Sequence, residues 1–115
     1  MTQIVEDMDQ LDQLFKENEN RLVVVDFFAS WCGPCKTIAE PYEELPSVFT
    51  DVLFLKVDVD EADDITDEHE VIKMPTFICF VNGKEVDRMN GASLEQLINM
   101  VDTQNKKLKT DQKQE

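Results

Sequence analysis

The apolar residues of this chain follow two patterns, helical spacing in some segments and short unbroken runs in others. Residues 8–18 and 38–49 have apolar side chains at helical spacing, so each segment is predicted to form a helix with one buried face. Residues 22–29, 53–59 and 76–81 are nearly unbroken runs rich in Val, Phe, Leu and Ile. Such runs are typical of strands that are buried on both faces of a sheet.

Turn and capping residues complete the predicted order of elements. Asn82-Gly83 is a strong signal for a two-residue hairpin turn, so residues 84–89 are predicted to return as an antiparallel edge strand. Ser93 is a good cap for a last helix, whose predicted buried stripe consists of Leu94, Leu97, Ile98 and Val101. The acidic segment 62–70 suits a short surface helix, and a further short strand is possible near Ile4.

This alternation of strands and helices predicts an α/β domain. Strand–helix–strand units imply right-handed crossovers and a mostly parallel sheet, to which the hairpin adds an antiparallel edge. The expected architecture is a central mixed sheet of four to five strands with helices on both faces. A length of 115 residues fits one domain, which we place at residues 1–104. Residues 105–115 are polar and basic, and we expect them to be a disordered tail.

Composition and charge narrow the class of function. The net charge of −14 disfavours nucleic acids and anionic membranes as partners, because their phosphates would be repelled. The first residues lack the features of a secretory signal, and no apolar run approaches the ~20 residues of a membrane span. We therefore expect a cytoplasmic protein with reduced thiols. Three cysteines in such a protein favour redox or metal chemistry over a structural disulfide framework.

Two of the cysteines lie where a buried strand gives way to a helix, in the segment Trp31-Cys32-Gly33-Pro34-Cys35. The free N–H groups and the dipole at a helix start stabilise a thiolate, so Cys32 is placed to act as a nucleophile. Cys35 lies one helical turn further on, within reach of a disulfide after small adjustment. Pro34 costs no hydrogen bond in the first turn, and Gly33 leaves room for a partner's backbone.

The spacing of the two cysteines leaves other interpretations open. One alternative is that the two cysteines form half of a zinc site. Structural zinc needs about four ligands, however, and only Cys79 and His69 remain as further candidates. A purely structural disulfide is another interpretation, although it would make no use of the thiolate stabilisation that a helix start provides. Cys79 itself alternates within an apolar strand, where a small buried core thiol is the simpler interpretation and a regulatory thiol the alternative.

Asp26 interrupts the apolar run between Val25 and Phe27. Burial of a carboxylate in a central strand raises its pKa, which would make Asp26 a proton acceptor near neutral pH. A simpler alternative is an Asp that reaches solvent at a strand end. Lys56 lies in the next strand, where an outward-pointing position on the sheet is the simpler interpretation.

The chain resembles the thioredoxin family over residues 4–104. The segments that carry the resemblance are VVVDFFASWCGPCK, Lys56-Val57-Asp58, Met74-Pro75-Thr76-Phe77, Asn82-Gly83-Lys84 and Gly91-Ala92. It is most similar to the short cytosolic thioredoxins of eukaryotes. The resemblance implies a thioredoxin fold and a thiol–disulfide oxidoreductase that reduces protein disulfides and maintains redox homeostasis.

The resemblance also implies roles for individual residues. Cys32 would attack a substrate disulfide, Cys35 would resolve the mixed disulfide and form a disulfide with Cys32, and Asp26 would deprotonate Cys35. Lys56 would lie near Asp26 and tune its charge. The peptide bond between Met74 and Pro75 would be cis and would present backbone groups to an extended substrate. The remaining implied substrate contacts form an apolar rim: Trp31, Gly91 and Ala92.

No metal or bound cofactor is implied by the resemblance. NADPH would be used indirectly, through a thioredoxin reductase that recharges the dithiol. The implied partners are this reductase and disulfide-containing proteins such as peroxiredoxins and ribonucleotide reductase. A different class of function stays open beside this one, namely a binding module or subunit that uses the same surface as a redox-switched docking site.

Overall fold

A five-stranded mixed sheet forms the centre of the structure, a computed structural model that describes residues 2–113. The strands lie in the order β1-β3-β2-β4-β5, with the first three parallel to one another and the last two antiparallel to their neighbours. Their bounds are β1 Gln3–Ile4, β2 Leu22–Phe28, β3 Leu53–Asp58, β4 Thr76–Val81 and β5 Lys84–Asn90. The mixed α/β sheet predicted from the sequence is therefore confirmed, but its antiparallel part is larger than the predicted hairpin edge, because β4 also runs antiparallel to β2.

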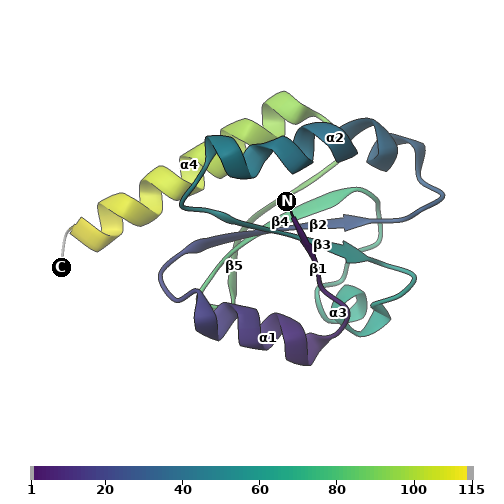
Figure 1. The fold of residues 1–115 in the computed structure, drawn as a ribbon, viewed down its shortest axis with the longest axis horizontal. Coiled ribbons are helices and arrows are strands. Elements are labelled where there is room, and N and C mark those ends of the chain that lie inside the picture. The colour runs from purple at the N-terminus through teal and green to yellow at the C-terminus, as the bar shows by residue number, and fades with distance from the viewer. Residues whose placement is uncertain (1, 114–115) are drawn as a thin grey trace.

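Four helices cover the two faces of the sheet. Helices α2 (Gly33–Val48) and α4 (Leu94–Lys113) lie on one face, and α1 (Met8–Glu17) and α3 (Asp63–Glu68) lie on the other (Figure 1). Helix α2 continues through two prolines, Pro41 and Pro46. Among residues 2–113, no helix combines the length and apolar character needed to cross a membrane.

The central strand β2 separates two apolar cores. Alternate side chains of a strand point to opposite faces of the sheet. Leu22 and Val24 accordingly lie in the core beneath α2 and α4, whereas Val23 and Val25 lie in the core beneath α1 and α3. Asp26 is two residues beyond Val24, so its side chain points toward the face that α2 covers. The dithiol segment follows where β2 ends.

The turn and the cap predicted from the sequence are both present. Asn82 and Gly83 have positive φ angles of 53° and 78°, as a type I′ hairpin turn requires at both central residues. At the start of α4, the Ser93 hydroxyl oxygen accepts a hydrogen bond from the Gln96 N–H at 3.2 Å. These local signals fix the two connections that bring β5 and α4 into place.

Two expectations about the C-terminal part of the chain were wrong. Residues 105–113 are helical, whereas the polar composition had suggested a disordered tail; the last two residues of the chain lie outside the described residues. The helix continues because Leu108 lies two turns beyond Val101 and packs on the same core. Within the predicted stripe, Ile98 is exposed, and Met100 is buried in its place.

Candidate active site

Cys32 and Cys35 form a disulfide at the start of α2, with their Cα atoms 5.3 Å apart. Cys32 caps the helix, and its sulfur accepts a hydrogen bond from the Cys35 N–H at 3.2 Å. An N–H donor aimed at the sulfur, together with the positive end of the helix dipole, stabilises a thiolate at Cys32 after reduction. The geometry thus favours Cys32 as the nucleophile of the pair.

The two residues between the cysteines are both exposed. Pro34 lies in the first turn of α2, where a missing N–H leaves no hydrogen bond unmade. A side chain added at Gly33 would meet nothing within 4 Å, so no internal contact requires glycine there. Open space above Gly33 agrees with the expected approach of a partner's backbone.

The loop before β4 lies against the dithiol. The Met74–Pro75 peptide bond is cis, as the resemblance implied, and the Met74 carbonyl oxygen lies 3.7 Å from the Cys32 sulfur. The Pro75 carbonyl oxygen accepts a hydrogen bond from the Gly91 N–H at 2.9 Å, which ties this loop to the end of β5. Beneath the surface, Phe28 and Val59 pack with Met74 around the two cysteines, contacts that the sequence did not predict.

Only part of the predicted apolar rim is exposed. The Trp31 side chain is 66% exposed and is held by a hydrogen bond from its Nε1–H to Asp60 at 2.9 Å. Gly91 is also exposed, but Ala92 is half-buried and packs against the core beneath α2 and α4. Ile72, which the sequence reasoning missed, is 84% exposed two residues before Met74.

Asp26 is buried beside the dithiol, as its position in an apolar run predicted. The residue is 2% exposed, and its Oδ1 atom has no hydrogen-bond partner. Burial raises the pKa of Asp26 to about 7, against the lowering effect of the nearby Lys56 and with a smaller raising effect from Glu43. A carboxyl with this pKa can both take up and release a proton near neutral pH.

Lys56 lies directly across from Asp26, because the two residues are paired in the register of β2 and β3. Its ammonium lies 4.9 Å from the centre of the Phe28 ring and 3.9 Å from the Glu43 carboxylate. The implied proximity of Lys56 to Asp26 is therefore present. Glu43 was not predicted, since nothing in its local sequence distinguishes it from the adjacent Glu44.

Asp26 and Cys35 line one small cavity of about 170 Å³. The other residues that line it are Phe28, Ala29, Ser30, Lys36, Ala39 and Lys56. Cys35 is only 5% exposed, and it shares this cavity with the buried carboxyl of Asp26. A proton acceptor, a resolving thiol and a cation are thereby brought together from β2, α2 and β3.

Cys79 and His69 lie away from the dithiol. Cys79 is buried in the core beneath α2 and α4, and burial raises the pKa of its thiol to about 12. His69 is half-buried between Phe27 and Phe80, whereas the sequence suggested a surface position. Within residues 2–113, no group of three or more His, Cys, Asp or Glu side chains is arranged to hold a metal ion.

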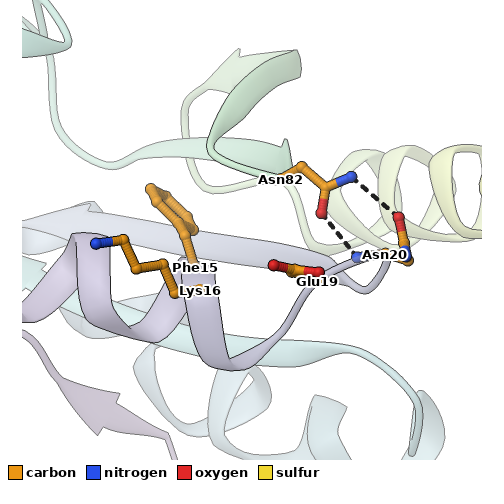
Figure 2. Close-up of a pocket in the computed structure, with 5 residues that line it drawn as sticks. All are labelled: Phe15, Lys16, Glu19, Asn20 and Asn82. Carbon is orange, nitrogen blue, oxygen red and sulfur yellow. Dashed lines mark hydrogen bonds between the residues drawn. The ribbon is translucent and has the colours of Figure 1, made fainter.

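A second hollow, of about 220 Å³, lies at the opposite end of β2 (Figure 2). Its lining residues are Phe15, Lys16, Glu19, Asn20 and Asn82. The two asparagines satisfy each other, since the Asn82 side chain donates to the Asn20 side chain at 3.1 Å and accepts from the Asn20 N–H at 2.8 Å. No thiol or buried acid lies in this hollow, so the dithiol end of the sheet is the candidate active site.

Comparisons with known proteins bear on the family of this chain. The family model described as Thioredoxin matches residues 3–103. Thioredoxin 1 of Plasmodium falciparum is 46% identical over 101 residues, which covers 85% of this chain and 95% of that protein. The X-ray structure of Fasciola hepatica thioredoxin is 41% identical, with a TM-score of 0.87 over 90% of this chain and 99% of that one.

A second similar structure comes from a study of a peroxiredoxin. It is described as the structural basis of the thiol resolving mechanism in yeast mitochondrial 1-Cys peroxiredoxin via glutathione/thioredoxin systems. Its matched chain is 34% identical, with a TM-score of 0.80, and the alignment covers 89% of this chain and 94% of that one.

Proposed function

Because this chain belongs to the thioredoxin family, we propose that Cys32 attacks the disulfides of substrate proteins and that Cys35 and Asp26 complete the exchange. The chain is a thiol–disulfide oxidoreductase that reduces protein disulfides by dithiol–disulfide exchange through Cys32 and Cys35. Within that reaction, each of these three residues has a separate role. The observation that carries it is a dithiol at a helix start whose second cysteine shares a cavity with a buried acid.

In the first step, the Cys32 thiolate attacks one sulfur of a substrate disulfide. The substrate S–S bond breaks, a new S–S bond joins Cys32 to the substrate, and the other substrate sulfur leaves as a thiolate. The hydrogen bond from the Cys35 N–H and the start of α2 support this assignment, because both stabilise a thiolate at Cys32. Both cysteines are 5% exposed, so the assignment rests on the helix start and not on a difference in exposure.

In the second step, Cys35 gives its proton to Asp26 and attacks the sulfur of Cys32. The mixed disulfide breaks, the substrate's second sulfur leaves, and the disulfide between Cys32 and Cys35 closes. The substrate has then gained two electrons from the dithiol, and its two thiolates take up one proton from Asp26 and one from solvent. The shared cavity and the pKa of about 7 for Asp26 support this role for the carboxyl.

Substrate binding is assigned to the surface around Cys32. An extended substrate segment would pair with the backbone of Met74, beside the cis Pro75, in the manner of an added strand. The exposed Trp31 ring and the open approach above Gly33 would flank that segment. Gly91 would contribute backbone at the other side, since its N–H already anchors the Pro75 carbonyl.

We further propose that an NADPH-dependent thioredoxin reductase returns the disulfide to the dithiol, so that this chain needs no bound cofactor of its own. Peroxiredoxins and ribonucleotide reductase are the proposed substrates, and the similarity to a chain from the yeast peroxiredoxin study supports the first of them. A cytoplasmic location, where a reducing supply of NADPH exists, suits this cycle.

Single-cysteine variants test the division of labour. Cys32→Ser should abolish reduction of insulin disulfides, because the attacking sulfur is gone. Cys35→Ser should still attack but should accumulate a covalent complex with substrate, visible on a non-reducing gel. Cys79→Ser is the matched control, and its activity should equal that of the unmodified chain. Full activity in Cys32→Ser, or covalent complexes in that variant rather than in Cys35→Ser, would contradict the assignment.

A further inference from the structure

Three charged side chains from three elements lie in a row behind the dithiol. Asp26 on β2 is paired in register with Lys56 on β3, and the Lys56 ammonium lies 3.9 Å from the Glu43 carboxylate on α2. Lys56 is held on its other side by the Phe28 ring. Its side chain is largely buried, at 18% exposure, so its charge is only partly screened by solvent.

Glu43, the outer member of this row, is itself anchored. The Thr2 N–H donates to the Glu43 carboxylate at 3.0 Å, and the Thr2 hydroxyl contacts both of its oxygens. Burial acts to raise the pKa of Glu43, but the hydrogen bonds from Thr2 and the charge of Lys56 outweigh it and lower the pKa overall. The carboxylate therefore stays charged at neutral pH and fixed in one place.

The anchor belongs to the same sheet edge as Lys56. Thr2 directly precedes β1, and β1 pairs with β3 so that Ile4 lies beside Lys56. The Val5 N–H also donates to the Lys56 carbonyl oxygen at 2.9 Å. The segment that includes Thr2, the anchor of Glu43, is thus hydrogen-bonded directly to the backbone of Lys56. The pairing of β1 with β3 therefore fixes where Glu43 lies relative to Lys56.

We propose that Glu43 is a positioning residue: anchored by Thr2, it fixes where the Lys56 ammonium sits beside Asp26 and thereby controls how readily Asp26 exchanges a proton with Cys35. The proposal rests on the proposed function, in which Asp26 accepts that proton. Asp26 is faced by Lys56 from β3 and by Cys35, Lys36, Tyr42 and Glu43 from α2, while its β4 neighbour, Phe77, carries no charge.

The direction of the effect follows from the charges. Removal of the Glu43 charge withdraws a negative group that raises the pKa of Asp26. It also leaves the Lys56 ammonium with Asp26 as its remaining carboxylate neighbour, which favours the ionised form of Asp26 further. Both effects move the protonation midpoint of Asp26 to lower pH in Glu43→Gln. Lys56→Met should move the same midpoint to higher pH.

The test is a pH titration of the Asp26 carboxyl by heteronuclear NMR in the oxidised protein, in which neither active-site cysteine titrates. Glu43→Gln should lower the midpoint by about 0.5–1 pH unit, a typical size for the loss of one nearby charge. Glu44→Gln, on the exposed side of the same turn, is the control and should leave it unchanged. An unchanged midpoint in Glu43→Gln, with a raised one in Lys56→Met, would overturn the proposal.

A double variant distinguishes an effect of Glu43 through the position of Lys56 from a direct effect of the Glu43 charge on Asp26. With Lys56→Met already present, Glu43→Gln should shift the midpoint by clearly less than it does alone, because the group that Glu43 positions is gone. An equal shift in both backgrounds would mean that Glu43 acts on Asp26 directly and would overturn the positioning role. Should Glu43→Gln not fold, Glu43→Asp decides: an intermediate shift supports the proposal, and no shift overturns it.

A kinetic measurement keeps this inference separate from the proposed function. The pH midpoint for resolution of a mixed disulfide by Cys35 should move with the NMR midpoint in Glu43→Gln. If the NMR midpoint moves and the kinetic one does not, the role of Asp26 as base is wrong while the positioning role of Glu43 stands. If only Lys56→Met moves the two midpoints, the role of Asp26 stands and that of Glu43 is wrong.

Discussion

Asp26 makes the stability of the fold depend on pH. Its buried carboxyl has a pKa of about 7, whereas the same group has a pKa of about 4 in an unfolded chain. Between these two pH values the folded protein holds a proton that the unfolded chain has lost. The contribution of Asp26 to the free energy of unfolding therefore falls as the pH rises from about 4 to about 7 and stays low above that window.

Asp26→Asn should consequently stabilise the oxidised protein at pH 8 but not at pH 3. The gain at pH 8 should approach about 4 kcal/mol, since three pKa units correspond to about 1.4 kcal/mol each. Urea unfolding followed by circular dichroism at both pH values measures it. Asp12→Asn, at an exposed position of α1, is the control and should show no such dependence. Equal stability of Asp26→Asn and the unmodified protein at pH 8 would contradict the raised pKa.

Cys79 should be chemically silent in the folded protein. Its thiol is fully buried, and burial raises its pKa to about 12, so almost no thiolate exists near neutral pH. With Cys32 and Cys35 held as a disulfide, iodoacetamide at pH 8 should label no residue in hours and should label Cys79 promptly in urea. Mass spectrometry locates the label. Prompt labelling of Cys79 without urea would instead support a regulatory thiol.

Single residues were predictable where the local sequence carries the signal. Asp26 stands out because a carboxylate inside an apolar run is expected to be buried away from solvent. Cys32 stands out because it lies where a predicted strand ends and a predicted helix begins. Glu43 gave no such signal, since its anchor Thr2 is 41 residues away and its neighbour Glu44 has the same chemistry. His69 was misjudged for the same reason, because the rings of Phe27 and Phe80 come from other strands.

At the scale of elements, Tyr42 fastens α2 to the sheet. Its hydroxyl is fully buried, donates to the Leu55 carbonyl oxygen at 2.7 Å and lies 3.2 Å from that of Val24. Tyr42→Phe should lower the free energy of unfolding by about 1–3 kcal/mol, because it removes the donor and leaves the ring in place. Urea unfolding measures the loss, and an unchanged urea midpoint would show that these carbonyls do not depend on the hydroxyl.

The last part of α4 extends beyond the residues that match the family model and is docked by several contacts. Leu108 packs on the core, the Lys109 ammonium lies 2.7 Å from the Asp51 carboxylate, and the Gln112 side chain donates to the Asn20 carbonyl oxygen at 2.7 Å. These contacts lie at the end of the sheet where β2 begins, away from the dithiol.

Truncation after residue 104 should therefore weaken the fold without slowing insulin reduction. The loss should be about 1–2 kcal/mol, as expected from a half-buried leucine and exposed polar contacts. Leu108→Ala should reproduce most of it, whereas Lys107→Ala, at an exposed position, should not. Thermal unfolding of the three variants gives the comparison. A truncated protein as stable as the full chain would show that the extension is not docked in solution.

Elements with strong periodicity were predicted well, and the extension was not. Residues 105–113 contain a single leucine among polar side chains, which by composition alone is typical of a disordered tail. Its placement seven residues after Val101 is the signal that was overlooked, because that spacing returns it to the buried stripe. For Ile98 the spacing was misleading. Its position fits the predicted buried stripe, yet Ile98 is exposed and the buried side chains of this turn are Leu97 and Met100.

For the whole molecule, the net charge of −14 should govern which substrates are met fastest. Carboxylates also gather at the end of β3 and on the segment that follows it: Asp58, Asp60, Glu61, Asp63 and Asp64. Asp60 binds Trp31, Asp58 accepts a hydrogen bond from the Asp60 N–H, and Asp64 accepts one from the Met8 N–H. A substrate with basic side chains around its disulfide should therefore be attracted to this end of the molecule.

Two model peptides with the same disulfide, one flanked by lysines and one by glutamates, test this expectation. At low ionic strength the lysine peptide should be reduced at least several times faster. The difference should shrink as salt approaches 0.5 M, where the screening length falls to about 4–5 Å. Stopped-flow measurement of Trp31 fluorescence follows the reaction. Equal salt dependence for the two peptides would show that the overall charge does not steer substrates.

Chain order and local pattern predicted which elements exist, but not the full order of the strands. Right-handed crossovers and the hairpin constrain β2, β3, β4 and β5, yet nothing local states that β4 lies beside β2 on the side opposite β3. That arrangement makes β2 the middle strand and gives Asp26 neighbours on both sides. It is decided by packing across the sheet, between residues far apart in sequence.

The docked end of α4 also determines how the protein can be attached to a surface. Gln112 binds the residue that precedes β2 by two positions, and the dithiol follows the other end of that strand, about 20 Å away (Figure 1). A tether attached after Lys113 would therefore leave Cys32 facing the liquid. Cys35→Ser immobilised in this orientation would make an affinity resin that captures substrates covalently and releases them with a reducing agent.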